Sequence, residues 1–129
     1  HIKVIGVEPL DSPTLFKALE ANERVVLDDV GRFADGVAVK QIGALPFEIA
    51  KKSVDDVVLV SNDEMCAAIK DIYEDVRSVS EPAGALSTAG VKKYILEHGL
   101  QGKNIVSVVS GANVNFDRLR YIAERADLG

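Results

Sequence analysis

Short runs of Val and Ile that are apolar on both faces constrain the fold of this chain more than any other feature. They occur at residues 2–7, 57–60 and 105–109, and segments with helix signals separate them. A strand that is apolar on both faces is typical of a parallel sheet covered by helices on both sides. The order of strands and helices therefore predicts an α/β fold, an open parallel sheet flanked by helices.

Five segments between and after these runs carry helix signals. The clearest is the capping box of Ser61 and Glu64, in which each side chain satisfies a free backbone amide of the other residue. The helix behind it is predicted to end near Arg77. We predict the other helices at residues 12–21, capped by Ser12, then at 45–53 and 82–99, and from Asn115 onward, capped by that residue.

Length and charge limit the classes of function. A chain of 129 residues fits one α/β domain that spans residues 1–129. The net charge of −5 leaves no concentrated basic face, so we expect no nucleic-acid partner. No apolar run approaches the roughly 20 residues of a membrane helix, so we expect no membrane partner. The single cysteine, Cys66, cannot form an internal disulfide, which favours a reducing, cytoplasmic location.

The segment that follows the third predicted strand is the first candidate site. It begins with Ser110 and Gly111. Ligands of open parallel sheets collect beyond the carboxyl ends of the strands. There Gly111 allows a ligand to approach the backbone closely, and Ser110 presents its hydroxyl to the crevice. A plain turn between a strand and a helix explains the same residues equally well.

Two further stretches are candidates, each with a plain structural alternative. Glu81 stands at a predicted helix start, where the helix dipole favours a carboxylate whether or not a ligand is near. Gly36 and Val37 lie in a stretch that also fits a simple turn. Lys40 closes that stretch and is a possible Schiff-base amine, but a solvated surface lysine is the more economical interpretation.

Taken together, these stretches resemble one known family. The segments that carry the resemblance are KVIGVEP at 3–9, FADGVAVK at 33–40, EPAGA at 81–85 and SGANVNFDRLR at 110–120. In this order they are similar, nearly from end to end, to the biosynthetic threonine ammonia-lyases, also called threonine deaminases or dehydratases. EPAGA combined with SGANVNFDRLR is specific, whereas either segment alone is shared with serine dehydratases and serine racemases.

The resemblance implies the fold-type II chemistry of pyridoxal 5'-phosphate. Ser110 matches the serine that hydrogen-bonds the pyridine nitrogen of the cofactor. A neutral hydroxyl does not hold that nitrogen protonated, so the ring is a weaker electron sink, which suits β-elimination. Glu81 matches an acid near the cofactor ring, and Gly36 and Val37 match a segment along the cofactor's edge. Gly111 would allow the backbone to approach the cofactor.

Other parts of the family's pattern are missing from this chain. The Schiff-base lysine belongs to a Ser-Phe-Lys motif that does not occur here, and Lys40 does not match it. The glycine-rich loop that cradles the cofactor phosphate is also absent. We therefore expect a partial catalytic domain, cut at both ends, with no catalytic residue of its own. Thr14 replaces the aspartate that, with Glu8, completes a cation site in relatives, so we predict no metal.

The resemblance also implies what the parent protein does. It would deaminate L-threonine to 2-oxobutanoate and ammonia, the first step of isoleucine synthesis, with an allosteric, isoleucine-responsive region beyond residue 129. We expect a homo-oligomeric parent, and self-association of the isolated chain through exposed sheet edges. A serine/threonine dehydratase or serine racemase of the same fold is one alternative. A non-catalytic α/β binding or regulatory module is another.

Overall fold

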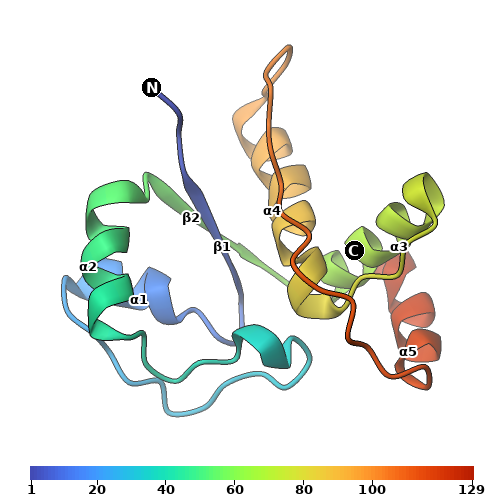
Figure 1. Ribbon diagram of the computed structural model, residues 1–129, viewed down its shortest axis with the longest axis horizontal. Helices are drawn as coiled ribbons and strands as arrows, with labels where there is room; N and C mark the ends of the chain where they lie inside the picture. The colour runs from blue at the N-terminus through green and yellow to red at the C-terminus, as the bar shows by residue number, and fades with distance from the viewer.

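Two parallel strands and five α-helices make up the computed structural model, which describes residues 1–129 (Figure 1). Strand β1 (Ile5–Pro9) pairs with β2 (Asp56–Val60), and Ile5 lies opposite Asp56. The helical elements are α1 (Thr14–Ala21), the 3-10 turn η1 (Asp35–Val37), α2 (Ala44–Ser53), α3 (Asn62–Val76), α4 (Pro82–His98), α5 (Arg118–Arg125) and the 3-10 turn η2 (Ala126–Leu128). The alternation and the parallel pairing confirm the predicted α/β fold.

The hydrophobic core lies between β2, α3 and α4, whereas α1 and α2 stand together on the other side of the strands (Figure 1). Val60 and Met65 are fully buried at its centre. Burial of each such side chain contributes about 1.5–3 kcal/mol to folding. The C-terminal elements close the core with Ile122 and Ala126. This arrangement leaves the N-terminal end of α4 beside the loops that follow the strands.

Several helices start or end where short-range sequence motifs predicted. The Ser61 hydroxyl accepts a hydrogen bond from the Glu64 amide at 3.1 Å, and the Ser61 amide donates to the Glu64 carboxylate at 2.6 Å. This capping box starts α3 as predicted. Arg77 and Gly99 end α3 and α4 in the left-handed conformation, with φ of 59° and 58°.

Two predicted helix caps are wrong. The Ser12 hydroxyl does not cap α1 but accepts a hydrogen bond from the Gly31 amide at 2.9 Å. Helix α1 is capped instead by Glu8, whose two carboxylate oxygens accept the amides of Leu15 and Phe16, each at 2.8 Å. The chain reverses direction after β1, which places the Glu8 side chain at the N-terminus of α1 and leaves Ser12 facing the next loop.

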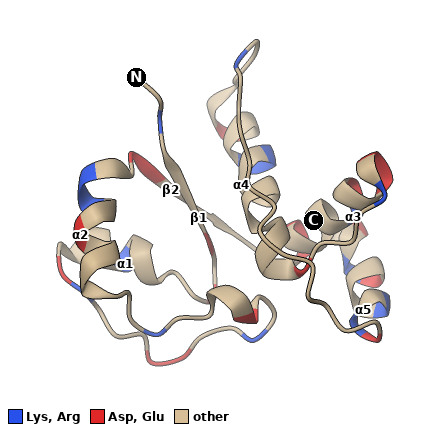
Figure 2. Cartoon of the chain, in the orientation of Figure 1, with Lys and Arg blue, Asp and Glu red and all other residues tan.

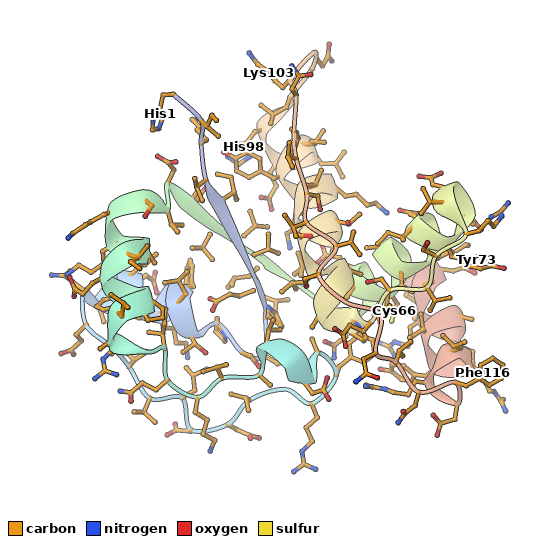
Figure 3. The ribbon with its side chains drawn as sticks, viewed as in Figure 1. His1, Cys66, Tyr73, His98, Lys103 and Phe116 are labelled. Carbon is orange, nitrogen blue, oxygen red and sulfur yellow. The ribbon has the colours of Figure 1, made fainter.

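The cap predicted for the last helix is wrong for a different reason. Helix α5 begins at Arg118, two residues later than a cap at Asn115 predicts, and no side chain caps it. Asn115 accepts the Arg118 amide through its backbone carbonyl at 3.0 Å. Phe116, which precedes this helix, is 87% exposed and lies at the periphery of the molecule (Figure 3).

The predicted third strand, residues 105–109, is not a strand in the structure. The segment runs beside α4 (Figure 1), and neither β1 nor β2 pairs with it. The Ser87 hydroxyl on α4 contacts the Ser107 hydroxyl at 2.9 Å and donates to the Val108 carbonyl at 2.7 Å. Val106 is 88% exposed. A β-branched run becomes a strand only where a neighbouring strand accepts its backbone hydrogen bonds, and this run has no such neighbour.

The surface of the chain is large for its mass. Its accessible area is 8180 Å², whereas a compact monomer of 13.9 kDa has about 6,700 Å². Charged residues of both signs lie on α2, α3 and α5, with acidic residues in excess on α3 and arginines in excess on α5 (Figure 2). None of the helices has both the length and the apolar composition needed to cross a bilayer. The excess area includes the apolar side chains of residues 105–109.

Candidate functional site

The candidate site residues come from three separate segments that approach the N-terminal end of α4. These residues are Gly36 and Val37 in η1, Glu81 before α4, and Ser110 and Gly111 after the extended segment. The Glu81 amide donates to the Gly111 carbonyl at 3.1 Å. A Cβ atom on Gly36 would lie 3.1 Å from the Cβ of Ala83, so η1 lies directly against the first turn of α4. Val37 is half-buried against the core.

The carboxylate of Glu81 lies against the backbone of Gly111. Glu81 is the N-cap residue of α4, yet its side chain makes no capping hydrogen bond. A Cβ atom on Gly111 would lie 2.0 Å from the Glu81 Oε1 atom, so a side chain at this position would have to displace the Glu81 carboxylate. The Glu81 carboxylate thus stands at the helix N-terminus, as the cap alternative requires, and it also lies against the segment that carries Ser110.

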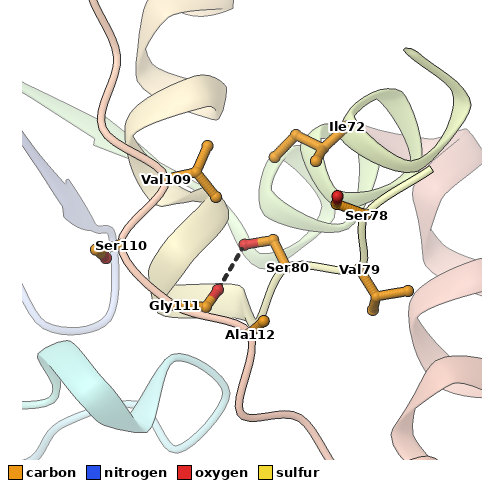
Figure 4. A pocket seen from close by; sticks show the side chains of 8 residues that line it. All are labelled: Ile72, Ser78, Val79, Ser80, Val109, Ser110, Gly111 and Ala112. Atoms are coloured by element: carbon orange, nitrogen blue, oxygen red, sulfur yellow. Dashed lines mark hydrogen bonds between the residues drawn. The ribbon is translucent and has the colours of Figure 1, made fainter. Parts of the chain in front are cut away.

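The backbone of helix α4 lies in direct contact with the backbone of the same segment. A Cβ atom on Gly84 would lie 2.3 Å from the Gly111 carbonyl oxygen and 2.9 Å from the Gly111 nitrogen. Ser80, which is 2% exposed, places its hydroxyl 3.1 Å from the Gly111 carbonyl oxygen (Figure 4). The sequence analysis missed both contacts. The signal available for them was the run of small residues around Glu81.

The Ser110 side chain is exposed at the surface of this segment. In Figure 4 it points away from Ser80 and Ile72, to the other side of the chain. Those two residues and Ser78 line a shallow cavity of about 240 Å³ behind the segment, which Ser110 borders. The Ser110 hydroxyl is thus presented outward from a backbone that α4 holds in place.

Glu8, Thr14 and Lys40 have other contacts. Burial raises the pKa of the Glu8 carboxyl group, and the hydrogen bonds from the Leu15 and Phe16 amides oppose that rise. The Thr14 hydroxyl donates to the Val39 carbonyl. The exposed Lys40 ammonium donates to the Asp28 carbonyl at 2.9 Å. No group of three or more His, Cys, Asp or Glu side chains is arranged to hold a metal ion.

Comparison with known proteins assigns the chain to a family. Residues 1–111 match the family described as pyridoxal-phosphate dependent enzyme. The biosynthetic L-threonine dehydratase of Pasteurella multocida is 58% identical over 129 residues, which is all of this chain and 25% of that protein. The mitochondrial threonine dehydratase of Schizosaccharomyces pombe is 55% identical over 131 residues, which covers 22% of that protein. The chain spans about a quarter of these relatives.

Solved structures agree with the sequence comparison. The processed form of threonine deaminase isoform 2 from Solanum lycopersicum superposes with a TM-score of 0.96 at 41% identity, over 98% of this chain and 35% of that one. A serine racemase from Dictyostelium discoideum superposes with a TM-score of 0.78 at 30% identity, over 89% of this chain and 36% of that one.

Proposed function

The chain belongs to the family of pyridoxal-phosphate-dependent enzymes, and from this premise we propose that it forms one side of the cofactor site of a threonine ammonia-lyase. The observation that carries the proposal is the 58% identity to a biosynthetic L-threonine dehydratase along the whole chain. The fold supports it, because a threonine deaminase superposes over 98% of the chain. The whole protein would convert L-threonine to 2-oxobutanoate and ammonia.

The residues of the candidate site fit pyridoxal phosphate. When bound, this cofactor supplies an electron sink for the bond that breaks at the substrate Cα atom. A planar ring would lie close to the backbone, and Gly36 and Gly111, which carry no side chain, would allow that approach beside α4. The ring nitrogen requires a polar partner, and the exposed Ser110 hydroxyl provides one.

Each residue of this chain has a separate task in the proposed site. Ser110 would donate its hydroxyl proton in a hydrogen bond to the ring nitrogen of the bound cofactor and would keep that proton. Because the partner is a neutral hydroxyl, the nitrogen is not held protonated. The Glu81 carboxylate, which lies next to Gly111, would line the ring. Val37 contributes an apolar wall that excludes water from the ring edge.

The remaining parts of the active site are proposed to lie in sequence outside this chain. The family's Ser-Phe-Lys motif and the glycine-rich phosphate loop do not occur in residues 1–129. We therefore expect the purified chain to release no 2-oxobutanoate from threonine, even with added cofactor. A homo-oligomeric assembly, a cytoplasmic location and an isoleucine response of the whole protein remain parts of the proposal.

The test uses the whole protein that contains this chain. L-threonine, L-serine and D-serine are compared as substrates by release of 2-oxoacid and ammonia, with L-threonine expected to have the highest kcat/KM. Replacement S110A is expected to change the absorption spectrum of the bound cofactor and to lower kcat. A serine substrate with the highest kcat/KM would favour a serine dehydratase or racemase, which the superposition on a serine racemase keeps as the second candidate. An unchanged spectrum and rate in S110A would remove Ser110 from the site.

A further inference from the structure

We propose that Ser80 is a positioning residue for Ser110. Its buried hydroxyl fixes the backbone at Gly111, and this holds the Ser110 hydroxyl at the orientation that the cofactor needs. The inference rests on the proposed role of Ser110 in binding the ring nitrogen. It adds a residue that makes no contact with cofactor or substrate.

The first argument is the burial of Ser80 and its contacts. Serine is usually an exposed residue, so a serine that is only 2% exposed needs hydrogen-bond partners. The Ser80 hydroxyl lies 3.1 Å from the Gly111 carbonyl oxygen and 3.0 Å from the Glu81 carbonyl oxygen. The Gly111 carbonyl also accepts the Glu81 amide at 3.1 Å. The Glu81 amide and the Ser80 hydroxyl, whose single proton is shared between the two carbonyl oxygens, together orient the Gly111 peptide group.

The second argument is the lack of space around that peptide group. A Cβ atom on Gly84 would lie 2.7 Å from the Ser80 hydroxyl and 2.3 Å from the Gly111 carbonyl oxygen. The Glu81 carboxylate closes the opposite side of Gly111. A serine hydroxyl fills the remaining space and also donates a proton, which an alanine methyl group cannot do.

The third argument is that Ser110 lies between two attachments to the same helix. Ser87 on α4 donates to the Val108 carbonyl at 2.7 Å, two residues before Ser110. Ser80 and Glu81 bind the Gly111 carbonyl, one residue after it. Within this chain no strand pairs with residues 105–109, so these side-chain bonds hold the segment in place of a ladder. Loss of the Ser80 hydrogen bond would weaken the attachment at Gly111, which is the one nearer to Ser110 in sequence.

The test is a double-mutant cycle in the whole protein, with S80A and S110A made alone and together. If Ser80 acts through Ser110, S80A lowers kcat/KM for threonine about fivefold when Ser110 is present, comparable to one hydrogen bond. In the S110A background the same change is expected to cost less than about twofold. The absorption maximum of the bound cofactor is expected to shift in S80A in the same direction as in S110A.

A second readout does not depend on activity. Hydrogen exchange of the Glu81 amide, which donates to Gly111, is expected to accelerate in S80A but not in S78A. Ser78 is an exposed serine two residues earlier in the same loop and is the matched control. If S80A does not fold, S80C replaces it, because the thiol fills the position that alanine would leave empty and is a weaker donor than the hydroxyl.

Three results would overturn the inference. Equal fold losses for S80A with and without Ser110 would show that Ser80 acts on the fold alone, while the proposed function stands. A loss in S78A equal to that in S80A would lead to the same conclusion. If S110A leaves both spectrum and rate unchanged, the proposed role of Ser110 fails first and the role of Ser80 fails with it.

Discussion

Replacement of Gly84 by alanine separates the requirements of helix α4 from those of the site. In an exposed helix interior, glycine to alanine stabilises by about 1 kcal/mol. At Gly84 the new methyl group would lie 2.3 Å from the Gly111 carbonyl oxygen and 2.7 Å from the Ser80 hydroxyl. Ordinary contact would require the Gly111 backbone to move by roughly 1 Å. We therefore expect G84A to destabilise the protein.

The magnitude follows from the competing contributions. Overpacking of this kind costs about 1–3 kcal/mol. Displacement of Gly111 also weakens its bonds from Ser80 and the Glu81 amide, at about 1 kcal/mol for each bond lost. After the helix-propensity gain is subtracted, the free energy of unfolding should fall by about 2 kcal/mol. A shift of 1 Å in a positioned group can cost up to about 100-fold in rate.

The control for G84A is G90A, six residues further along the same helix. A Cβ atom on Gly90 would lie 2.3 Å from a methyl group of Val7 in β1, away from Gly111. Both variants of the whole protein are therefore expected to unfold at lower temperature than wild type. Only G84A should shift the cofactor absorption and lower kcat/KM by more than about tenfold. Stabilisation by G84A would refute the contact with Gly111, and an equal cofactor shift in G90A would refute its specificity.

Three further predictions follow from individual side chains. Burial, with a smaller contribution from Asp63, raises the pKa of Cys66 to about 11. A thiol reagent at pH 8 should therefore label Cys66 slowly in the native protein and rapidly in denaturant. Rapid labelling of the native protein would contradict the burial of this thiol. Replacement S61A should lower the free energy of unfolding by about 1 kcal/mol by removing the α3 cap, whereas S78A in an uncapped loop should not, as urea titration would show. The hydrogen bond from Lys70 lowers the pKa of Asp127 below its usual 3.8, so the stability that this carboxylate contributes is present above pH 3.8 and is lost as the pH falls through the lowered pKa. The difference in unfolding temperature between wild type and D127N should therefore be constant above about pH 5 and shrink below it. A difference that grows in acid would reverse the assigned sign.

Features that depend on neighbouring residues were predictable from the sequence. Ser61 and Glu64 are three residues apart and satisfy each other in any helix that starts there. Gly99 ends α4 because it adopts a positive φ at low cost. Both strands were predicted from apolar runs: residues 57–60 match β2, whereas β1 begins at Ile5 and ends at Pro9, later than the predicted residues 2–7.

Features that depend on the return path of the chain were not predictable. Glu8 caps α1 because the turn after β1 brings it to the amides of Leu15 and Phe16, and no spacing rule anticipates this. Residues 105–109 have the composition of a strand but no partner strand within the chain. The contact of Glu81 with Gly111 joins residues thirty positions apart. Ser80 was missed because a buried serine and an exposed one look alike in sequence.

The small residues of helix α4 allow it to pack closely against both the sheet and the candidate site. Gly84, Ser87 and Thr88 are three and four residues apart, which places them on one face of the helix. That face meets the 107–111 segment through close backbone contact and hydroxyl bonds. Gly90 lies on another side, where Val7 of β1 approaches it. The backbone of α4 thus lies in close contact with the sheet on one face and with the Ser110 segment on another. Larger residues on either face would separate the candidate site from the core that supports it.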